Sequence, residues 1–360
     1  MVFQGIQILR ALAANGVLAS HLLTVEGKYG HAEPLLPNWA HFGAVGVDLF
    51  FVISGFIMVT IAGKLSWRRF LYARITRIYP AYWVYTLLVF GAALVMPAAV
   101  NASFEHAPSL WRSVFLVPDT VKPLLAVGWT LVHEMYFYVV FAAILALGVA
   151  QRWALAAWAC VVVLAGLFFA AESYRAVQPI ASTLFHPLTL EVILGGLIGH
   201  AVMGGYVRFP RASLCLGLVG WVAAMITADD LKSLVDVADW EHVLKMGIPS
   251  ALIVYGAVAF EKARGSFGRS WLVLLGDASY SIYLSHILVL SLVGRILTRM
   301  TLQGAVFEGL LIVLCVAGGN LFGLLSYRFM ERPLMGLSRK ALSKYVSWKS
   351  KALTPINESR

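Results

Sequence analysis

The sequence predicts an all-α integral membrane protein, a polytopic helical bundle of about ten transmembrane helices with both termini in the cytoplasm. Composition is the first reason: 60% of the 360 residues are hydrophobic and only 13% are charged, against about 25% charged residues in soluble domains. The second reason is that the apolar runs are too many for one buried core, and each is about long enough to cross a bilayer. The third is the distribution of basic and acidic residues among the loops.

The predicted spans follow one another through short loops, except for two longer loops at about 98–123 and 229–244. The first run is not a cleavable signal sequence, because it is long, contains Arg10 and lacks a small-x-small exit. The later runs are assigned by length and hydropathy, in a chain whose mean hydropathy is +0.80. In order, the predicted spans are 3–24, 41–63, 77–97, 124–149, 153–171, 180–204, 212–228, 245–261, 271–294 and 306–327.

Basic residues determine the predicted orientation. With ten spans both termini share one side, which collects Lys64, Arg68, Arg69, Arg74, Arg77, Arg152, Arg208, Arg211, Lys262, Arg264, Arg269 and the tail from Arg328 to Lys351. The opposite side carries most of the acids: Glu26, Glu33, Glu105, Asp119, Glu172, Asp229, Asp230, Asp236, Asp239 and Glu241. The positive-inside rule then places both termini in the cytoplasm, with Arg295 and Arg299 as the discordant pair.

The net charge of +10 is therefore explained by topology and by contact with membrane lipids. Charges distributed in this way argue against nucleic acid as a partner. We expect one transmembrane domain over residues 1–335, followed by a basic cytoplasmic tail over residues 336–360.

Arg10 and His21 are the most informative pair of the first span. They lie eleven residues apart, which in a helix is three turns plus ~20°, so they share one stripe with ~16 Å of rise between them. A charged arginine facing lipid is costly, so the stripe is expected to face the protein interior or a wet cavity. The alternative is that Arg10 snorkels to the interface and His21 is a packing residue.

Polar residues within the other spans are further candidates for function. Asp48 lies in the glycine-containing segment 46–56, where it either contributes to a site or caps the helix entry. Glu134 lies a few residues into the fourth span, where a carboxylate requires a partner such as a histidine or arginine from another helix. Packing between helices is the simpler role for the remaining candidates, which are Glu191, Asp277, His286 and Glu308.

No metal site is predicted. The pair His133-Glu134 lacks the second histidine of a zinc-protease motif. The three cysteines, Cys160, Cys215 and Cys315, lie far apart within apolar runs and show no metal-ligand spacing.

The segment 64–80, predicted as the first cytoplasmic loop, is rich in arginine. Arg74 and Arg77 are three residues apart, so in a helical turn they share a face and can grip one phosphate group. Contact with lipid headgroups is the alternative, because basic residues are expected beside a cytoplasmic membrane face.

Taken together, these residues resemble the acyltransferase-3 family of bacterial membrane O-acyltransferases, most closely its exopolysaccharide (succinoglycan) acetyltransferase branch. The resemblance runs from about residue 5 to residue 334 and depends on the order and spacing of several blocks. The blocks are Gly5–Ala14 leading to His21, Gly46–Phe56, Arg74–Arg77 with Tyr79-Pro80, Trp129–Leu131 with Glu134 and Phe137-Tyr138, Ser279–His286, and Glu331–Leu334.

The resemblance implies a cytoplasmic acyl-CoA donor such as acetyl-CoA, with succinyl or a short branched acyl group as the alternatives to acetyl, and a lipid-linked or exported polysaccharide acceptor at a bacterial inner membrane. It implies that Arg74 and Arg77, with Arg69 and Arg10, hold the CoA phosphates. It also implies that His21 accepts the proton of a sugar hydroxyl, for which a neutral imidazole is suited. Glu134 or Asp48 would then orient His21, as the buried acid of a catalytic triad does.

Two other classes of function remain open from the residues alone. A proton-coupled transporter or polysaccharide flippase would use His21 and Glu134 as a proton relay. A binding component of an export machine would need no catalysis. No half-to-half repeat and no matched pair of broken helices is evident in the sequence, which weakens the transporter interpretation.

Overall fold

The computed structural model describes residues 3–30, 34–63, 65–96, 108–168, 179–228, 240–266, 268 and 270–341, and within them it contains helices and no strand. The first half comprises α1 (Gln4–Tyr29), η1 (Asn38–Val45), α2 (Gly46–Ala62), α3 (Trp67–Val95), α5 (Leu110–Phe115), η3 (Ala126–Gly128), α6 (Trp129–Leu147) and α7 (Gln151–Phe168). The second half comprises α9 (Pro179–Leu184), α10 (Thr189–Met203), α11 (Pro210–Thr227), α13 (Trp240–His242), η4 (Val243–Gly247), α14 (Ile248–Arg264), α15 (Trp271–Asp277), α16 (Ser279–Leu297), α17 (Gly304–Ser326) and η5 (Tyr327–Glu331).

The predicted polytopic helical bundle is confirmed. In the described ranges, nine helical segments are long and apolar enough to cross a membrane, and α7 is a shorter apolar helix at the position of the remaining predicted span. Large apolar side chains cover the outside of these helices; Leu87, Leu147 and Ile226 are 64%, 76% and 74% exposed. Exposure on that scale is expected of a lipid-facing surface.

Several predicted boundaries are wrong. Residues 67–76 were expected in a loop, but α3 begins at Trp67, because arginine is a good helix former and hydropathy detects only the apolar part of a helix. The predicted span 180–204 is divided into α9 and α10, with Pro187 between them. The predicted span 271–294 is divided at Ala278 into α15 and α16. The last helical segment extends to Ala341, into the expected basic tail, and the rest of that tail lies outside the described residues; the domain boundary at 335 stays a prediction.

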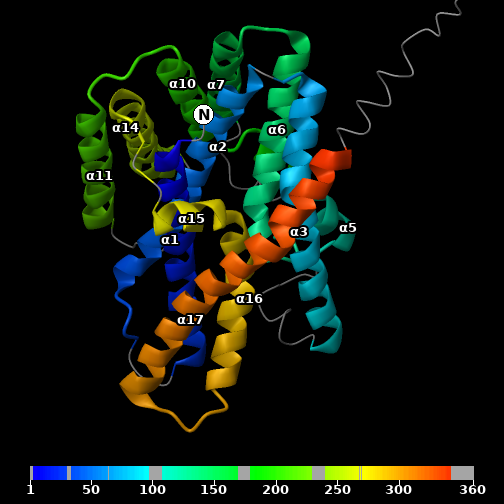
Figure 1. The fold of residues 1–360 in the computed structure, drawn as a ribbon, viewed down its shortest axis with the longest axis vertical. Helices are drawn as coiled ribbons and strands as arrows, with labels where there is room; N and C mark the ends of the chain where they lie inside the picture. The colour runs from blue at the N-terminus through cyan, green and yellow to red at the C-terminus, as the bar shows by residue number, and fades with distance from the viewer. Residues whose placement is uncertain are drawn as a thin grey trace, which may run out of the picture.

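Helix α1 lies inside the bundle and contacts η1, α2, α14, α15, α16 and α17. In Figure 1, α17 crosses the front of the bundle diagonally, with α16 beside it and α10, α11 and α14 grouped on the opposite side from α3 and α6. The backbones of helices α2 and α10 approach each other closely: a Cβ at Gly55 would lie 1.9 Å from the Val192 carbonyl oxygen, and one at Gly195 would lie 1.9 Å from that of Val52. The glycine content of the segment 46–56 thus serves helix packing.

Candidate functional site

A cavity of about 100 Å³ lies between α1, α2, α3, α6 and α16. Three arginines line it: Arg10 from α1, with Arg74 and Arg77 from α3. One carboxylate, that of Glu134 on α6, also lines it, together with the rings of Tyr138, Tyr280 and Tyr283. The structure therefore brings together Glu134 and three of the four arginines that were expected to bind the donor.

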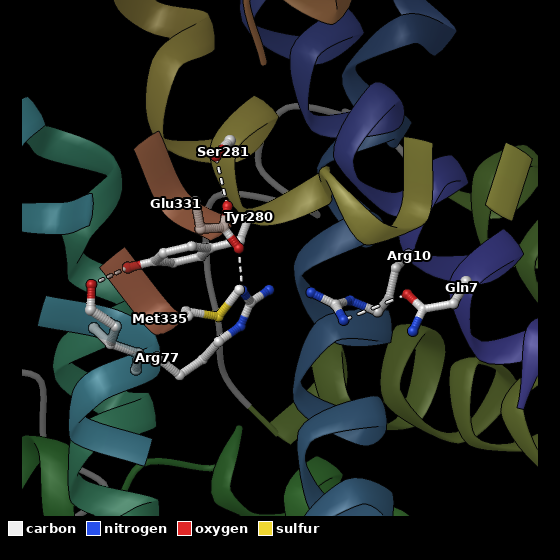
Figure 2. Close-up of polar contacts among 8 residues, drawn as sticks. Gln7, Arg10, Arg77, Tyr280, Ser281, Glu331 and Met335 are labelled. Carbon is white, nitrogen blue, oxygen red and sulfur yellow. Dashed lines mark hydrogen bonds and ion pairs between the residues drawn. The ribbon is translucent and has the colours of Figure 1, made fainter. Parts of the chain in front are cut away.

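Arg77 is anchored by the C-terminal part of the chain. Its guanidinium forms an ion pair with Glu331, whose side chain is 1% exposed, and its Nη1 lies 3.1 Å from the Met335 sulfur. Glu331 also accepts a 2.5 Å hydrogen bond from the Ser281 hydroxyl. The guanidinium of Arg77 lies 5.3 Å from the ring centre of Tyr280. Figure 2 shows this network, with Arg10 and Gln7 of α1 across from it.

The positive charges of Arg10 and Arg74 are less neutralised by neighbouring carboxylates than that of Arg77. Figure 2 shows the Arg10 side chain extending toward Arg77, and Arg10 Nη1 lies 3.5 Å from Gln7 Oε1, the limit of a hydrogen bond. Arg74 stacks on Tyr138, 5.7 Å from the ring centre. Within the ranges that the structure describes, neither arginine forms an ion pair with a carboxylate, and the buried Arg74 Nε has no hydrogen-bond partner.

Glu134 is hydrogen-bonded by hydroxyl groups. It accepts a 3.1 Å bond from Ser54 Oγ of α2 and a bond from the Tyr138 hydroxyl one turn further along α6. Both bonds go to Oε1 of the carboxylate. The expected histidine or arginine is not a direct partner among the described residues, because the three arginines line the same cavity without forming an ion pair with Glu134. Three positive charges around the cavity therefore face two negative ones, those of Glu134 and Glu331, and the site is cationic.

His21 lies away from the cavity lining, farther along α1, and packs against His286 of α16 with 5.2 Å between ring centres. His286 is fully buried, and its Nδ1 lies 2.7 Å from the Tyr283 carbonyl oxygen. A neutral imidazole in that position donates from Nδ1, which makes Nε2 the acceptor. Tyr283 connects the two regions, because its ring lines the cavity and lies 5.8 Å from that of His286.

Asp48 belongs to a different cluster. It is 2% exposed and its Oδ1 lies 2.7 Å from His242 Nε2. In the described part of the chain, the hydrogen bonds of Asp48 and Glu134 go to His242, Ser54 and Tyr138, so neither carboxylate orients His21 in the expected triad. His286 is a neighbour of His21, and the sequence marks it only as one of several intramembrane candidates.

Other positions differ from expectation or were missed. Arg69 is exposed in the first turn of α3 and does not line the cavity, whereas Arg74 and Arg77, one and two turns later, do. Tyr280 and Ser54 were not singled out, because a tyrosine or serine in an apolar helix carries no signal of its own. His242 was missed because it lies at the end of a predicted loop.

The fold and this cavity define a polytopic membrane protein with a cationic internal site, and the comparisons identify its family. The acyltransferase domain profile matches residues 3–325, so the chain belongs to the acyltransferase-3 family and is an O-acyltransferase. It is 33% identical over 324 residues to the exopolysaccharide production protein ExoZ of Rhizobium meliloti, covering 86% of this chain and 95% of that protein.

More distant relatives are similar over less of their own length. A putative O-acetyltransferase of Staphylococcus aureus (strain MRSA252) is 24% identical over 96% of this chain, which spans 59% of that longer protein. The peptidoglycan O-acetyltransferase OatA of Listeria monocytogenes is 28% identical over 38% of this chain and 23% of its own length. No solved structure matches the chain. The resemblance in the sequence motifs is thus confirmed at the level of the family.

Proposed function

We propose that this membrane O-acyltransferase moves an acetyl group from acetyl-CoA to a hydroxyl group of a lipid-linked or exported polysaccharide at a bacterial inner membrane. The observation that carries the donor assignment is the convergence of Arg10, Arg74 and Arg77 on one cavity with an excess of positive charge. Guanidinium groups bind phosphate oxygens in a planar, often bidentate geometry. The similarity to an exopolysaccharide production protein supports the polysaccharide acceptor.

The three arginines have different roles in this proposal. Arg77 is held in place by Glu331 and presents its remaining nitrogens to the cavity. Arg10 and Arg74, which have no carboxylate partner in the described chain, supply the charge that the donor phosphates neutralise. Arg74 Nε is a buried donor without an acceptor among those residues, and a phosphate oxygen would satisfy it.

His21 is the proposed general base. It removes the proton of the acceptor hydroxyl as the hydroxyl oxygen attacks the thioester carbonyl; the new ester C–O bond forms, the C–S bond breaks, and the proton passes to the departing CoA thiolate. His286, in ring contact with His21 and held by the Tyr283 carbonyl, is the proposed positioning residue for this imidazole. Helix α1 places Arg10 and His21 on one stripe with ~16 Å of rise between them, so a donor anchored at Arg10 extends along α1 toward His21.

The decisive experiment uses purified protein in neutral detergent with acetyl-CoA and isolated polysaccharide repeat units. Free CoA should appear in step with an acetyl mass increment on the saccharide, and no membrane gradient should be needed. A transporter would give neither product under these conditions. A different result would be that CoA is released and other added hydroxyl compounds become acetylated, while the saccharide does not. That result would support the donor site and refute the polysaccharide as the acceptor.

A further inference from the structure

Three buried ionisable side chains meet in a part of the molecule that the proposed reaction does not use. Asp48 lies in the first turn of α2, Glu191 in the first turn of α10, and His242 at the end of α13. They are 2%, 0% and 5% exposed. One potential ligand atom from each lies within 4.8 Å of the other two, and none of the three residues lines the arginine cavity.

The charge of this cluster is not balanced by the surrounding described residues. Both carboxylate oxygens of Glu191 are buried, and no N–H or O–H donor of the described residues reaches them; the polar side chain beside Glu191 is the Asp48 carboxyl, which also contacts His242. No lysine or arginine of the described ranges forms an ion pair with either acid. If both acids are ionised, even a protonated His242 leaves one excess negative charge, and the N-terminal ends of α2 and α10 supply only partial positive charge; the cluster must then hold either a cation or a proton.

We propose that Asp48, Glu191 and His242 bind a divalent transition-metal ion, with Zn²⁺ as the ion whose preferences fit. An imidazole nitrogen with carboxylate oxygens is a zinc-type ligand set, whereas Mg²⁺ and Ca²⁺ prefer oxygen ligands throughout. Ligand atoms around a tetrahedral ion with bonds of 2.0–2.1 Å stand about 3.3 Å apart. The three side chains are therefore already near the required spacing, and the ion would replace the Asp48–His242 hydrogen bond.

The backbone around the cluster restricts Glu191. A Cβ on Gly247 would lie 2.8 Å from both Cγ and Oε1 of Glu191. The Glu191 side chain therefore packs directly against the backbone of Gly247, with no room for a larger residue there. Gly247 ends the π-helix η4, which begins directly after His242, and π-helical segments are frequent at functional sites. The ion would connect the starts of α2 and α10 to the segment that leads into α14.

Such an ion would have a structural role, because α2 also contributes Ser54 to the arginine cavity and the ion fixes the start of that helix. The proposal does not depend on the acyl-transfer chemistry. Its primary readout is metal content, so failure of the metal site and failure of the acetyltransferase assignment are distinguishable.

The test begins with full-length protein from which any affinity tag has been cleaved, purified without chelators. Elemental mass spectrometry should find about one zinc ion per chain. After removal with a chelator, titration with Co²⁺ should produce the visible d–d absorption of a low-coordinate nitrogen- and oxygen-ligated site. Asp48→Asn, Glu191→Gln and His242→Ala should each abolish both signals.

The matched control is Glu26→Gln. Glu26 is also a buried carboxylate, but it accepts hydrogen bonds from the backbone N–H groups of Leu35 and Leu36, at 2.6 and 3.2 Å, so its substitution should leave the metal content unchanged. Gly247→Ala displaces Glu191 without removing a ligand atom, and should weaken Co²⁺ binding about 10–100-fold.

Two results would overturn the proposal. One is that the wild-type protein neither contains nor takes up a metal and shows the infrared carbonyl stretch of a protonated carboxylic acid. If that band disappears in Glu191→Gln, the cluster holds a proton in place of an ion. The other is stoichiometric metal retained in all three ligand variants. If those variants do not fold, the cobalt titration of the wild-type protein still decides the question.

Discussion

Replacement of Arg74 by glutamine is the sharpest test of the donor site. Arg74 lines the cavity and stacks on Tyr138, and its Nε has no partner within the described residues. Its removal therefore leaves no carboxylate without a counter-charge, and the folded protein should tolerate the change. If a CoA phosphate accepts hydrogen bonds from Arg74 in the complex, the substitution acts on donor binding.

The expected size follows from the type of bond lost. A hydrogen bond to a charged group contributes about 1.5–3 kcal/mol, so the KM for acetyl-CoA should rise on the order of 10–100-fold. Arg74→Lys should recover only part of the loss, because an ammonium group lacks the planar, bidentate geometry of a guanidinium. Contact with a lipid headgroup would contribute only about 1 kcal/mol per residue and would vary with lipid composition instead of donor concentration.

The assay is a titration of acetyl-CoA against purified variants in neutral detergent, repeated after addition of anionic lipid. Arg68→Gln is the matched control, because Arg68 lies on the same helix, is exposed, and stacks on Trp67 outside the cavity. Its KM should equal that of the unsubstituted protein. An unchanged donor KM in Arg74→Gln, with normal folding, would refute the assignment of the cavity to CoA phosphates.

Three further substitutions test other parts of the site. His21→Ala should lower kcat about 10²–10⁴-fold with little change in donor KM, because it removes the proposed general base. Near-normal kcat in a correctly inserted protein would exclude that role. Glu134→Gln removes a negative charge beside the proposed phosphate site and should lower the KM for acetyl-CoA several-fold, so a rise measured in the same titration would contradict the proposed charge balance. Arg77→Gln leaves the buried Glu331 without its ion-pair partner and should lower the free energy of unfolding by about 3–5 kcal/mol. Adding Glu331→Gln should recover part of this loss in a thermal unfolding experiment. Equal melting temperatures for the single and double variants would count against a structural ion pair.

The sequence predicted most of the fold because hydropathy reports directly on burial in lipid. It failed at places where hydropathy carries no information. The basic first turns of α3 are helical although they are not apolar. The break at Ala278 lies inside the run 271–294, whose mean hydropathy is high enough for one span although Asp277 and Ser279 interrupt it. The orientation of the termini still depends on the distribution of basic residues, and stays a prediction.

The site was predictable where spacing within one helix determines a shared face. Arg74 and Arg77 do line one cavity, as their separation by three residues suggests. Pairing between helices was not predictable, because no rule connects Glu134 to Ser54 on α2, or Asp48 to His242 nearly two hundred residues away. A buried carboxylate requires some partner, but several helices can supply a hydroxyl or an imidazole.

If the donor phosphates bind at Arg10 and the transfer takes place at His21, as proposed, helix α1 also limits which molecules can serve as donors. It is continuous from Gln4 to Tyr29, so the separation of about 16 Å along its axis between Arg10 and His21 is fixed by helical geometry. A donor held by its phosphates at Arg10 must have a flexible arm of comparable reach to deliver its carbonyl carbon to His21. Acetyl phosphate, whose acyl carbon is bonded directly to the phosphate oxygen, cannot occupy both ends at once. The enzyme would therefore discriminate among activated acyl groups by the length of the carrier, before any contact with the acyl chain itself.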